Sequence, residues 1–170
     1  MNPEKLRRSL QKISTEYLSK LDNIPDHEFQ RTPFNGGWSY SQVYSHIWDA
    51  SLLSLMALEN SYNGKGKVKP TAFLVKVILL YGAFPPAARY KVPKDLETKV
   101  RLITKAESRT FIKEFLTQLA KHMTHISSAD LRLKTRHPRL GYLNAQEWLR
   151  FIEIHLKHHL KQIKRIEKTF

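Results

Sequence analysis

The sequence predicts an all-α protein, an antiparallel four-helix bundle with an additional crossover helix. Apolar residues recur at spacings of three and four in four long stretches, which is the pattern of amphipathic helices. No run of alternating residues is bounded by turn signals, so strands are not needed to account for the core. A length of 170 residues, with 41% hydrophobic residues and no internal repeat, favours one globular domain over residues 1–170.

The first two helices are defined by apolar spacing and by one capping signal. The first helix stops before Pro25 and carries its apolar stripe on Leu6, Leu10, Ile13, Tyr17 and Leu21. Ser39 and Gln42 have the spacing of a capping box, which predicts a second helix from about Tyr40 to Tyr62. An Asn-Gly pair ends that helix.

Two further capping-box spacings mark the starts of two more long helices. Thr104 and Glu107 precede a helix whose apolar residues recur every four positions, namely Phe111, Phe115, Leu119 and Met123. Asn144 and Glu147 precede the longest helix, which runs almost to the end of the sequence. The additional helix is predicted over residues 71–81, before an irregular basic stretch that reaches Pro93.

The positive charge is concentrated in two blocks, within a formal net charge of +14. Residues 63–105 hold ten basic and two acidic residues, and residues 132–170 hold ten and three. These blocks suit the binding of a polyanion. One functional hypothesis is therefore a non-enzymatic module that binds nucleic acid, independently of its sequence and in a salt-sensitive way. This hypothesis predicts that the affinity for a polyanion at low salt falls when five basic residues are neutralised, namely Lys91, Lys94, Lys99, Arg101 and Lys105.

Cysteine is absent, which excludes disulfides, thiolate metal ligands and a cysteine nucleophile. The basic start lacks the apolar core of a signal peptide, and the longest apolar stretch, residues 73–84, is short and carries Lys76. We therefore expect a cytoplasmic protein without a membrane partner. The sequence shows no apolar helix face, beyond those assigned to the core, that would force a dimer. A homodimer through exposed helix faces is nevertheless an alternative.

Three histidines are predicted to face the same part of the core. At 100° per residue, His155 and His159 lie on the apolar stripe of the last helix, and His46 lies on the inward face of the second. Three imidazoles can hold one metal ion and leave coordination positions open for water or substrate. The alternative is that they are separate core histidines satisfied by hydrogen bonds.

Other polar and aromatic residues near these faces have two interpretations each. Asp49, one turn from His46, would orient an imidazole, act as a base, or be a solvated helix residue. Trp38 and Trp148 would line a pocket or belong to the plain core.

The remaining histidines are expected to lie outside the site. His158 lies off the stripe beside lysines and is expected at the surface, while His137 precedes a proline and is a loop residue or lines the pocket mouth. The others lie near loops or helix ends and have no expected role in the site: His27, His122 and His125.

Two motifs far apart in the sequence resemble one family. Gly37-Trp38-Ser39, followed by Gln42-Val43 and His46, resembles the opening of the second helix in the DinB-like (DNA-damage-inducible) metal-binding superfamily. The segment from His137-Pro138 to Trp148, and then His155 to Ile163, resembles that superfamily's last helix and the loop before it. The resemblance covers residues 1–170, with little to match in residues 63–105.

The resemblance implies a divalent metal ion on His46, His155 and His159, with Gln162 in a supporting or pocket-lining position. Some members of the superfamily are similar to metal-dependent thiol S-transferases, and others have no assigned activity. The first hypothesis from this resemblance is a transferase that activates an exogenous low-molecular-weight thiol toward a small electrophilic substrate. A metal-dependent hydrolase on the same site is an alternative, and imidazole ligands do not distinguish Ni, Zn, Fe and Mn.

Overall fold

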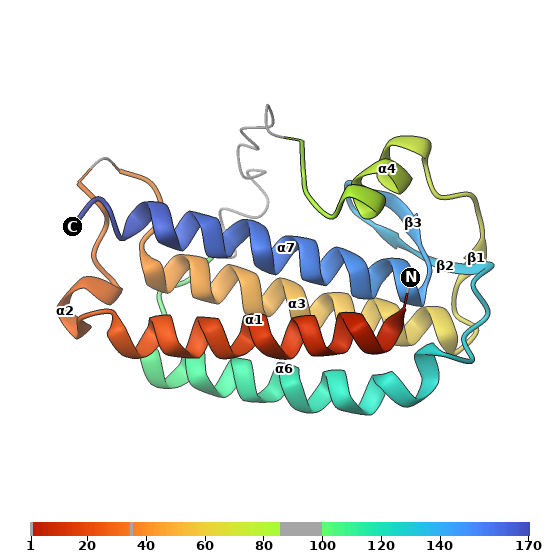
Figure 1. The fold of residues 1–170 in the computed structure, drawn as a ribbon, viewed down its shortest axis with the longest axis horizontal. Helices are drawn as coiled ribbons and strands as arrows, with labels where there is room; N and C mark the ends of the chain where they lie inside the picture. Colours follow the sequence, from red (N-terminus) through yellow and green to blue (C-terminus); the bar gives the residue numbers. More distant parts are fainter. Residues whose placement is uncertain (1, 35, 86–99) are drawn as a thin grey trace.

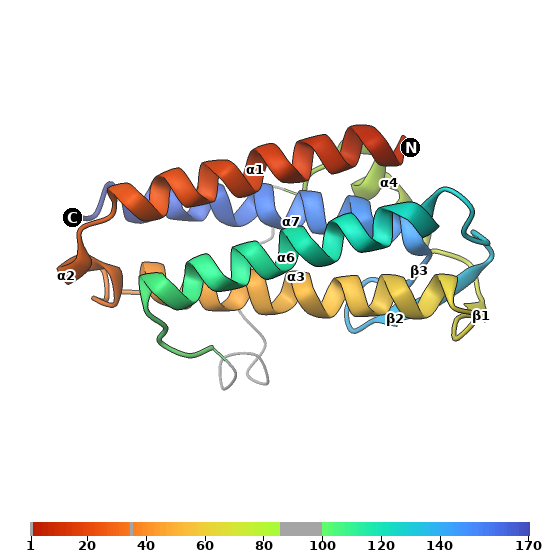
Figure 2. The same ribbon diagram turned by 90° about the horizontal axis from the view of Figure 1, so that it is seen from below.

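The computed structural model describes residues 2–34, 36–85 and 100–170. Four long helices lie side by side as a bundle (Figures 1 and 2): α1 (Pro3–Asn23), α3 (Tyr40–Tyr62), α6 (Lys105–Ile126) and α7 (Ala145–Ile166). A shorter helix, α4 (Phe73–Tyr81), lies in the connection between α3 and α6. The predicted four-helix bundle and its additional helix are confirmed. The bundle is not antiparallel throughout as predicted, because two pairs of neighbouring helices run parallel.

Three of the long helices begin where the sequence predicted, because their first turns are closed by side chains. In each one the N-cap side chain accepts a hydrogen bond from the backbone N–H three residues on, and the side chain at that position accepts one from the N-cap backbone. The three pairs are Ser39 with Gln42, Thr104 with Glu107, and Asn144 with Glu147. Each pair satisfies two of the backbone donors that a helix start leaves unpaired.

Buried aromatic side chains join the helices at the centre of the bundle. Tyr17 on α1 donates its hydroxyl to the carbonyl of Leu156 on α7 at 2.8 Å, and Tyr44 on α3 donates to the carbonyl of Tyr17 at 2.7 Å. Trp48 packs its ring against Tyr17 and against Phe115 of α6, with centroid distances of 5.2 and 5.4 Å. The apolar stripes of all four helices therefore meet in one core.

The long connection between α3 and α6 determines which neighbouring helices run parallel. It brings the chain back to the end of the bundle where α3 begins, so α3 and α6 run in the same direction (Figure 2). Ser41 and Ile103, which lie near the starts of these helices, are hydrogen-bonded. α1 and α7 are also parallel, since Lys20 near the end of α1 pairs with Glu167 just beyond α7, whereas α3 and α7 are antiparallel.

A small antiparallel sheet at one end of the bundle was not predicted (Figure 1). It contains β1 (Lys67–Val68), β2 (Leu133–His137) and β3 (Gly141–Leu143), in the order β1-β2-β3. The sequence pattern did not indicate these short strands, whereas the core lies largely in helices, as predicted. Strands of two to five residues are too short to show an alternating pattern, and β1 pairs with a segment far along the chain. The four-residue helix α2 (Asp26–Phe29), between α1 and α3, was not predicted either.

The sheet is attached to the bundle through Thr135 of β2. Its hydroxyl donates to the carbonyl of Ala57 on α3 at 2.8 Å and accepts a hydrogen bond from the indole N–H of Trp148 on α7, also at 2.8 Å. Gly141 begins β3 with φ +75°, a left-handed conformation that glycine adopts at little cost. The hairpin therefore ends directly before α7 and directs the start of that helix.

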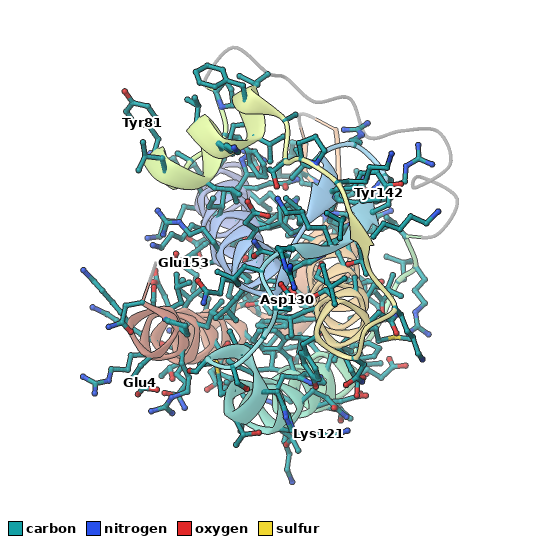
Figure 3. The ribbon with its side chains drawn as sticks, turned by 90° about the vertical axis from the view of Figure 1, so that its right-hand side faces the viewer. Glu4, Tyr81, Lys121, Asp130, Tyr142 and Glu153 are labelled. Carbon is teal, nitrogen blue, oxygen red and sulfur yellow. The ribbon has the colours of Figure 1, made fainter. Side chains whose placement is uncertain are left out.

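Helix α4 lies on the outside of α7 (Figure 3). Its inner face is buried through Val75, Ile78 and Leu79, and the guanidinium of Arg150 on α7 donates to the carbonyl of Leu79 at 2.9 Å. The outer face exposes large apolar side chains, so the expectation that no apolar stripe is left over was wrong. The sequence pattern showed an apolar helix but not that only one side of it would be covered. Within the described ranges, no helix combines the length and apolarity needed to cross a bilayer.

We expect Ser41→Ala to lower the free energy of unfolding by about 1–3 kcal/mol, because it leaves the buried N–H of Ile103 without its acceptor. Ser41 Oγ accepts from that N–H at 2.6 Å and donates to the Ile103 carbonyl at 2.7 Å. Urea unfolding measures the change. The control is Ser19→Ala on the exposed side of α1, expected to stay within about 0.5 kcal/mol of wild type. Equal stability of the two variants would contradict the bridging role of Ser41.

Candidate metal centre

Three histidines from two helices meet between α3 and α7. His46 comes from α3, and His155 and His159 lie one turn apart on α7. One ring nitrogen from each lies within 4.8 Å of the other two. His159 is buried, with 8% of its surface exposed, while His46 and His155 are partly exposed, so solvent reaches the group. The structure thus brings together the three side chains that the helical periodicity placed on facing surfaces.

Gln162 fixes the orientation of His159. Its amide oxygen accepts a hydrogen bond from His159 Nδ1 at 2.7 Å, so the neutral ring carries its hydrogen on Nδ1. The lone pair is then on Nε2, which faces His155 Nε2 at 3.1 Å. Gln162 therefore directs an unprotonated nitrogen toward the other two imidazoles.

Burial keeps these imidazoles neutral. It lowers the pKa of His46 to about 4 and that of His159 to about 3, with smaller effects from neighbouring histidines. Burial, and then the other histidines nearby, also lowers the pKa of His155 well below its usual value. At neutral pH all three rings can offer a lone pair, which is the form that binds a metal.

The donor set fits a divalent metal ion. An ion that binds imidazole nitrogen at roughly 2.0–2.1 Å holds two such nitrogens about 3 Å apart, close to the separation of the two Nε2 atoms. Three neutral nitrogen ligands suit zinc, nickel, iron or copper better than magnesium or calcium, which prefer oxygen. The group could therefore hold such an ion and leave part of its coordination sphere open.

Two aromatic side chains enclose the histidines. The ring of Trp38 lies 5.1 Å from that of His46, and Phe151 stacks on His155 with a centroid distance of 5.4 Å. Trp38 was singled out from the sequence as a pocket residue, whereas Phe151 was not. The signal for Phe151 was available, since it lies one turn before His155 on the same stripe.

Trp148 and Asp49 lie farther from the histidines. The buried ring of Trp148 lies 5.8 Å, between centroids, from that of Phe151, which in turn stacks on His155. Asp49 lies 3.5 Å from the hydroxyl of Ser45 and 4.0 Å from the guanidinium of Arg101. The hypothesis that Asp49 orients an imidazole or acts as a base stays a prediction.

His158 is half-buried, contrary to the expectation of a surface position. Its ring lies 5.4 Å from Phe84 and 5.0 Å from His159, because the chain that follows α4 crosses α7 at this point. Helical periodicity alone does not reveal such a crossing. Of the other histidines, His122 is buried and bonded to the Tyr62 hydroxyl at 2.8 Å, while His27 and His125 are exposed.

His137 ends β2 and lies beside the aromatic wall of the group. Its Nδ1 accepts hydrogen bonds from the backbone N–H groups of Arg139 and Leu140 at 3.1 and 3.0 Å, so the ring hydrogen is on Nε2. The ring lies 4.6 Å from that of Phe151. Burial, and secondly the charge of Arg139, lowers the pKa of His137 to about 4.

The first basic block is described only in part. Lys91, Lys94 and Lys99 lie outside the described residues. Arg101 is near Asp49, and the ammonium of Lys105 donates to the Asp26 carboxylate at 2.9 Å. Attachment of this block to nucleic acid stays a prediction.

A sequence model of the DinB superfamily matches residues 10–163. The uncharacterised protein YuaE of Bacillus subtilis (strain 168) is 23% identical over 154 residues, which span 90% of this chain and 91% of YuaE.

Solved structures with the same fold include YfiT from Bacillus subtilis, described as a probable metal-dependent hydrolase with an unusual four-helix bundle topology. It is 14% identical, with a TM-score of 0.66 over 98% of this chain and 86% of YfiT. The mycothiol-dependent maleylpyruvate isomerase is 12% identical, with a TM-score of 0.61 over 94% of this chain but 60% of the isomerase. At these identities the likeness shows the fold and not the activity.

The pKa of His137 predicts how stability depends on pH. Its pKa of about 4 in the folded protein lies below the roughly 6.5 of an unfolded chain, so the unfolded state takes up the proton first as the pH falls. The contribution of the neutral His137 ring to the free energy of unfolding is therefore fully present above about pH 6.5, and it is lost as the pH falls toward 4. We expect His137→Asn, which keeps an acceptor near Nδ1 but does not titrate, to gain up to about 3 kcal/mol relative to wild type over this range.

Urea unfolding of both proteins in chelator at pH 7.5 and pH 4.5 measures this difference. A difference between the two proteins that does not change with pH would show that His137 titrates normally.

Proposed function

The chain belongs to the DinB superfamily, and we propose that it is a metal-dependent enzyme that transfers an exogenous low-molecular-weight thiol to a small electrophile. The observation that carries the proposal is the convergence of three neutral imidazoles, from His46, His155 and His159, on one point between α3 and α7. These side chains would hold a divalent ion. Nickel, zinc, iron and manganese all remain compatible with imidazole ligands.

The bound ion would supply electrostatic stabilisation of a thiolate or hydroxide at neutral pH. The residues of the chain have separate parts in this scheme. The three histidines carry no charge of their own, so they leave the positive charge of the ion undiminished. Gln162 holds the ring of His159 in the tautomer that binds, and such supporting hydrogen bonds commonly change metal affinity 10–100-fold.

The aromatic side chains pack against two of the ligands and shield them in part from water. Trp38 lies against His46, and Phe151 stacks on His155, so aromatic packing helps to hold two of the three rings in place. Trp148 supports Phe151 from behind. An apolar wall of this kind suits a small organic substrate and strengthens electrostatic interactions inside the site.

The thiol must come from outside, because the sequence contains no cysteine. Support for a thiol co-substrate comes from the mycothiol-dependent isomerase, which shares this fold and by its name uses a low-molecular-weight thiol. Asp49, partly exposed and three residues after His46, is the nearest candidate to accept a proton on α3.

Hydrolysis on the same site is the second candidate function. It is favoured by the likeness to YfiT, a probable metal-dependent hydrolase that this chain matches over 98% of its length. Both reactions would need the same three histidines and differ in whether a thiol or water is activated.

The test is an activity screen of the purified chain loaded in turn with Zn, Ni, Fe(II) and Mn. Thiol transfer is assayed with glutathione, coenzyme A and mycothiol against a bimane or chlorodinitrobenzene electrophile, and hydrolysis with nitrophenyl esters. We expect metal-dependent thiol transfer in wild type that falls by about 100-fold or more in His159→Ala, since loss of a supporting contact alone costs 10–100-fold.

His27→Ala is the matched control, because His27 is exposed on α2, and it should keep full activity. Ester hydrolysis without thiol transfer, lost in His159→Ala, would favour the hydrolase. Thiol transfer that persists in His159→Ala or in chelator would contradict the proposal.

A further inference from the structure

Helix α4 is apolar on both of its faces, and within the described residues it is covered on one of them. Val75, Ile78 and Leu79 pack against the bundle. The outer face leaves most of the surface of four large side chains exposed, namely Phe73 (83%), Leu80 (80%), Tyr81 (80%) and Leu74 (63%). Figure 3 shows Tyr81 pointing away from the bundle at the outer edge of α4.

An outer face of this composition is unusual for a helix on the surface of a bundle. A surface helix normally turns polar side chains to water, and a helix that is apolar all round is normally buried. At 100° per residue, Phe73, Leu80 and Tyr81 fall within one outward-facing sector, so the exposed side chains form a continuous patch. Continuous exposed apolar patches mark surfaces that bind something.

The rest of the fold holds α4 in this orientation. The guanidinium of Arg150 donates to the carbonyl of Leu79 near the end of the helix. Gly82, at φ +73°, ends the helix in a left-handed conformation, and a Cβ there would collide with Arg150. The outer face is therefore presented by a fixed helix end that is bonded to α7.

Four exposed lysines accompany the apolar patch. Lys76 lies at its edge on α4, and the segment that leads into the helix carries Lys65, Lys67 and Lys69. The sequence has no acidic residue between Asn60 and Lys94. Within the described part of the chain, none of the four lysines forms an ion pair, so their charge is available to an anionic partner.

We propose that this face, formed by Phe73, Leu74, Leu80 and Tyr81 with Lys69 and Lys76, binds the surface of a bilayer that contains anionic lipids. Aliphatic and aromatic side chains flanked by lysines are the composition of helices that lie in the membrane interface. Each lysine near an anionic surface adds to the attraction. A second copy of the chain fits less well, because a two-fold contact would place the lysines of one copy against those of the other.

This surface does not depend on the histidine group and needs no membrane-spanning helix. The expectation of no membrane partner rested on the lack of a long apolar segment, and a short helix lying in the interface does not require one. The nine residues of α4 are long enough to bury one face among lipid headgroups.

The test is co-sedimentation of the full chain with vesicles of phosphatidylcholine that contain about 30% phosphatidylglycerol, or none. We expect binding to the anionic vesicles only, and a decrease as salt is raised. Phe73→Ser combined with Leu80→Ser should abolish it. Lys69→Ser combined with Lys76→Ser should weaken it about 25-fold, which is about fivefold for each lysine.

Matched controls change the same chemistry elsewhere. Leu53→Ser with Met56→Ser alters two side chains on α3 that are 64% and 59% exposed, and Lys12→Ser with Lys168→Ser removes the same charge from other exposed positions. Both should bind like wild type. The altered residues in all variants are exposed, so each protein should keep its circular dichroism spectrum and its unfolding midpoint.

Three results would overturn the proposal. Wild type could fail to bind anionic vesicles, or the controls could lose as much binding as the α4 variants. Sedimentation velocity could instead show a dimer that Phe73→Ser with Leu80→Ser dissociates, while no vesicle binding occurs. In that case the outer face of α4 would join two copies of the chain.

Discussion

The packing of α3 against α7 is the constraint on which the histidine group depends. Each helix contributes an apolar stripe, and the imidazoles lie within those stripes rather than on loops. Their positions are therefore set by the same burial that holds the bundle together. Hydrogen bonds from Tyr17 to Leu156 and from Tyr44 to Tyr17 fix the positions of α1, α3 and α7 along the bundle axis relative to one another. A shift of one turn between α3 and α7 would remove His46 from reach of the other two rings.

The long connection between α3 and α6 accounts for three features of the fold that the packing of the four long helices does not determine. It makes α3 and α6 parallel, it adds β1 to the hairpin of β2 and β3, and it places α4 on the outside of α7. Its described part also brings Phe84 over His158, next to the histidine group. The exposed face of α4 and the half-buried position of His158 thus both result from this segment lying across α7.

The sequence predicts the long helices and the histidine group well, because both depend on local periodicity. Capping residues such as Ser39 and Asn144 act within four residues, and His155 and His159 share a face whatever surrounds them. The strands, the half-buried position of His158 and the exposed side of α4 depend on contacts between distant segments. No local pattern contains that information. The contacts of Gln162 followed from its place on the stripe, whereas the partners of Asp49 and Trp148 did not.

The most direct test of the central claim is the metal content of the chain purified without an affinity tag or chelator, compared between wild type and His155→Ala. The account predicts about one divalent ion per folded wild-type chain and its loss in the variant, with unchanged helical content in both. Wild type that contains no metal and takes up none on titration, or a variant that retains it, would contradict the account. The three histidines would then be held only by packing and hydrogen bonds.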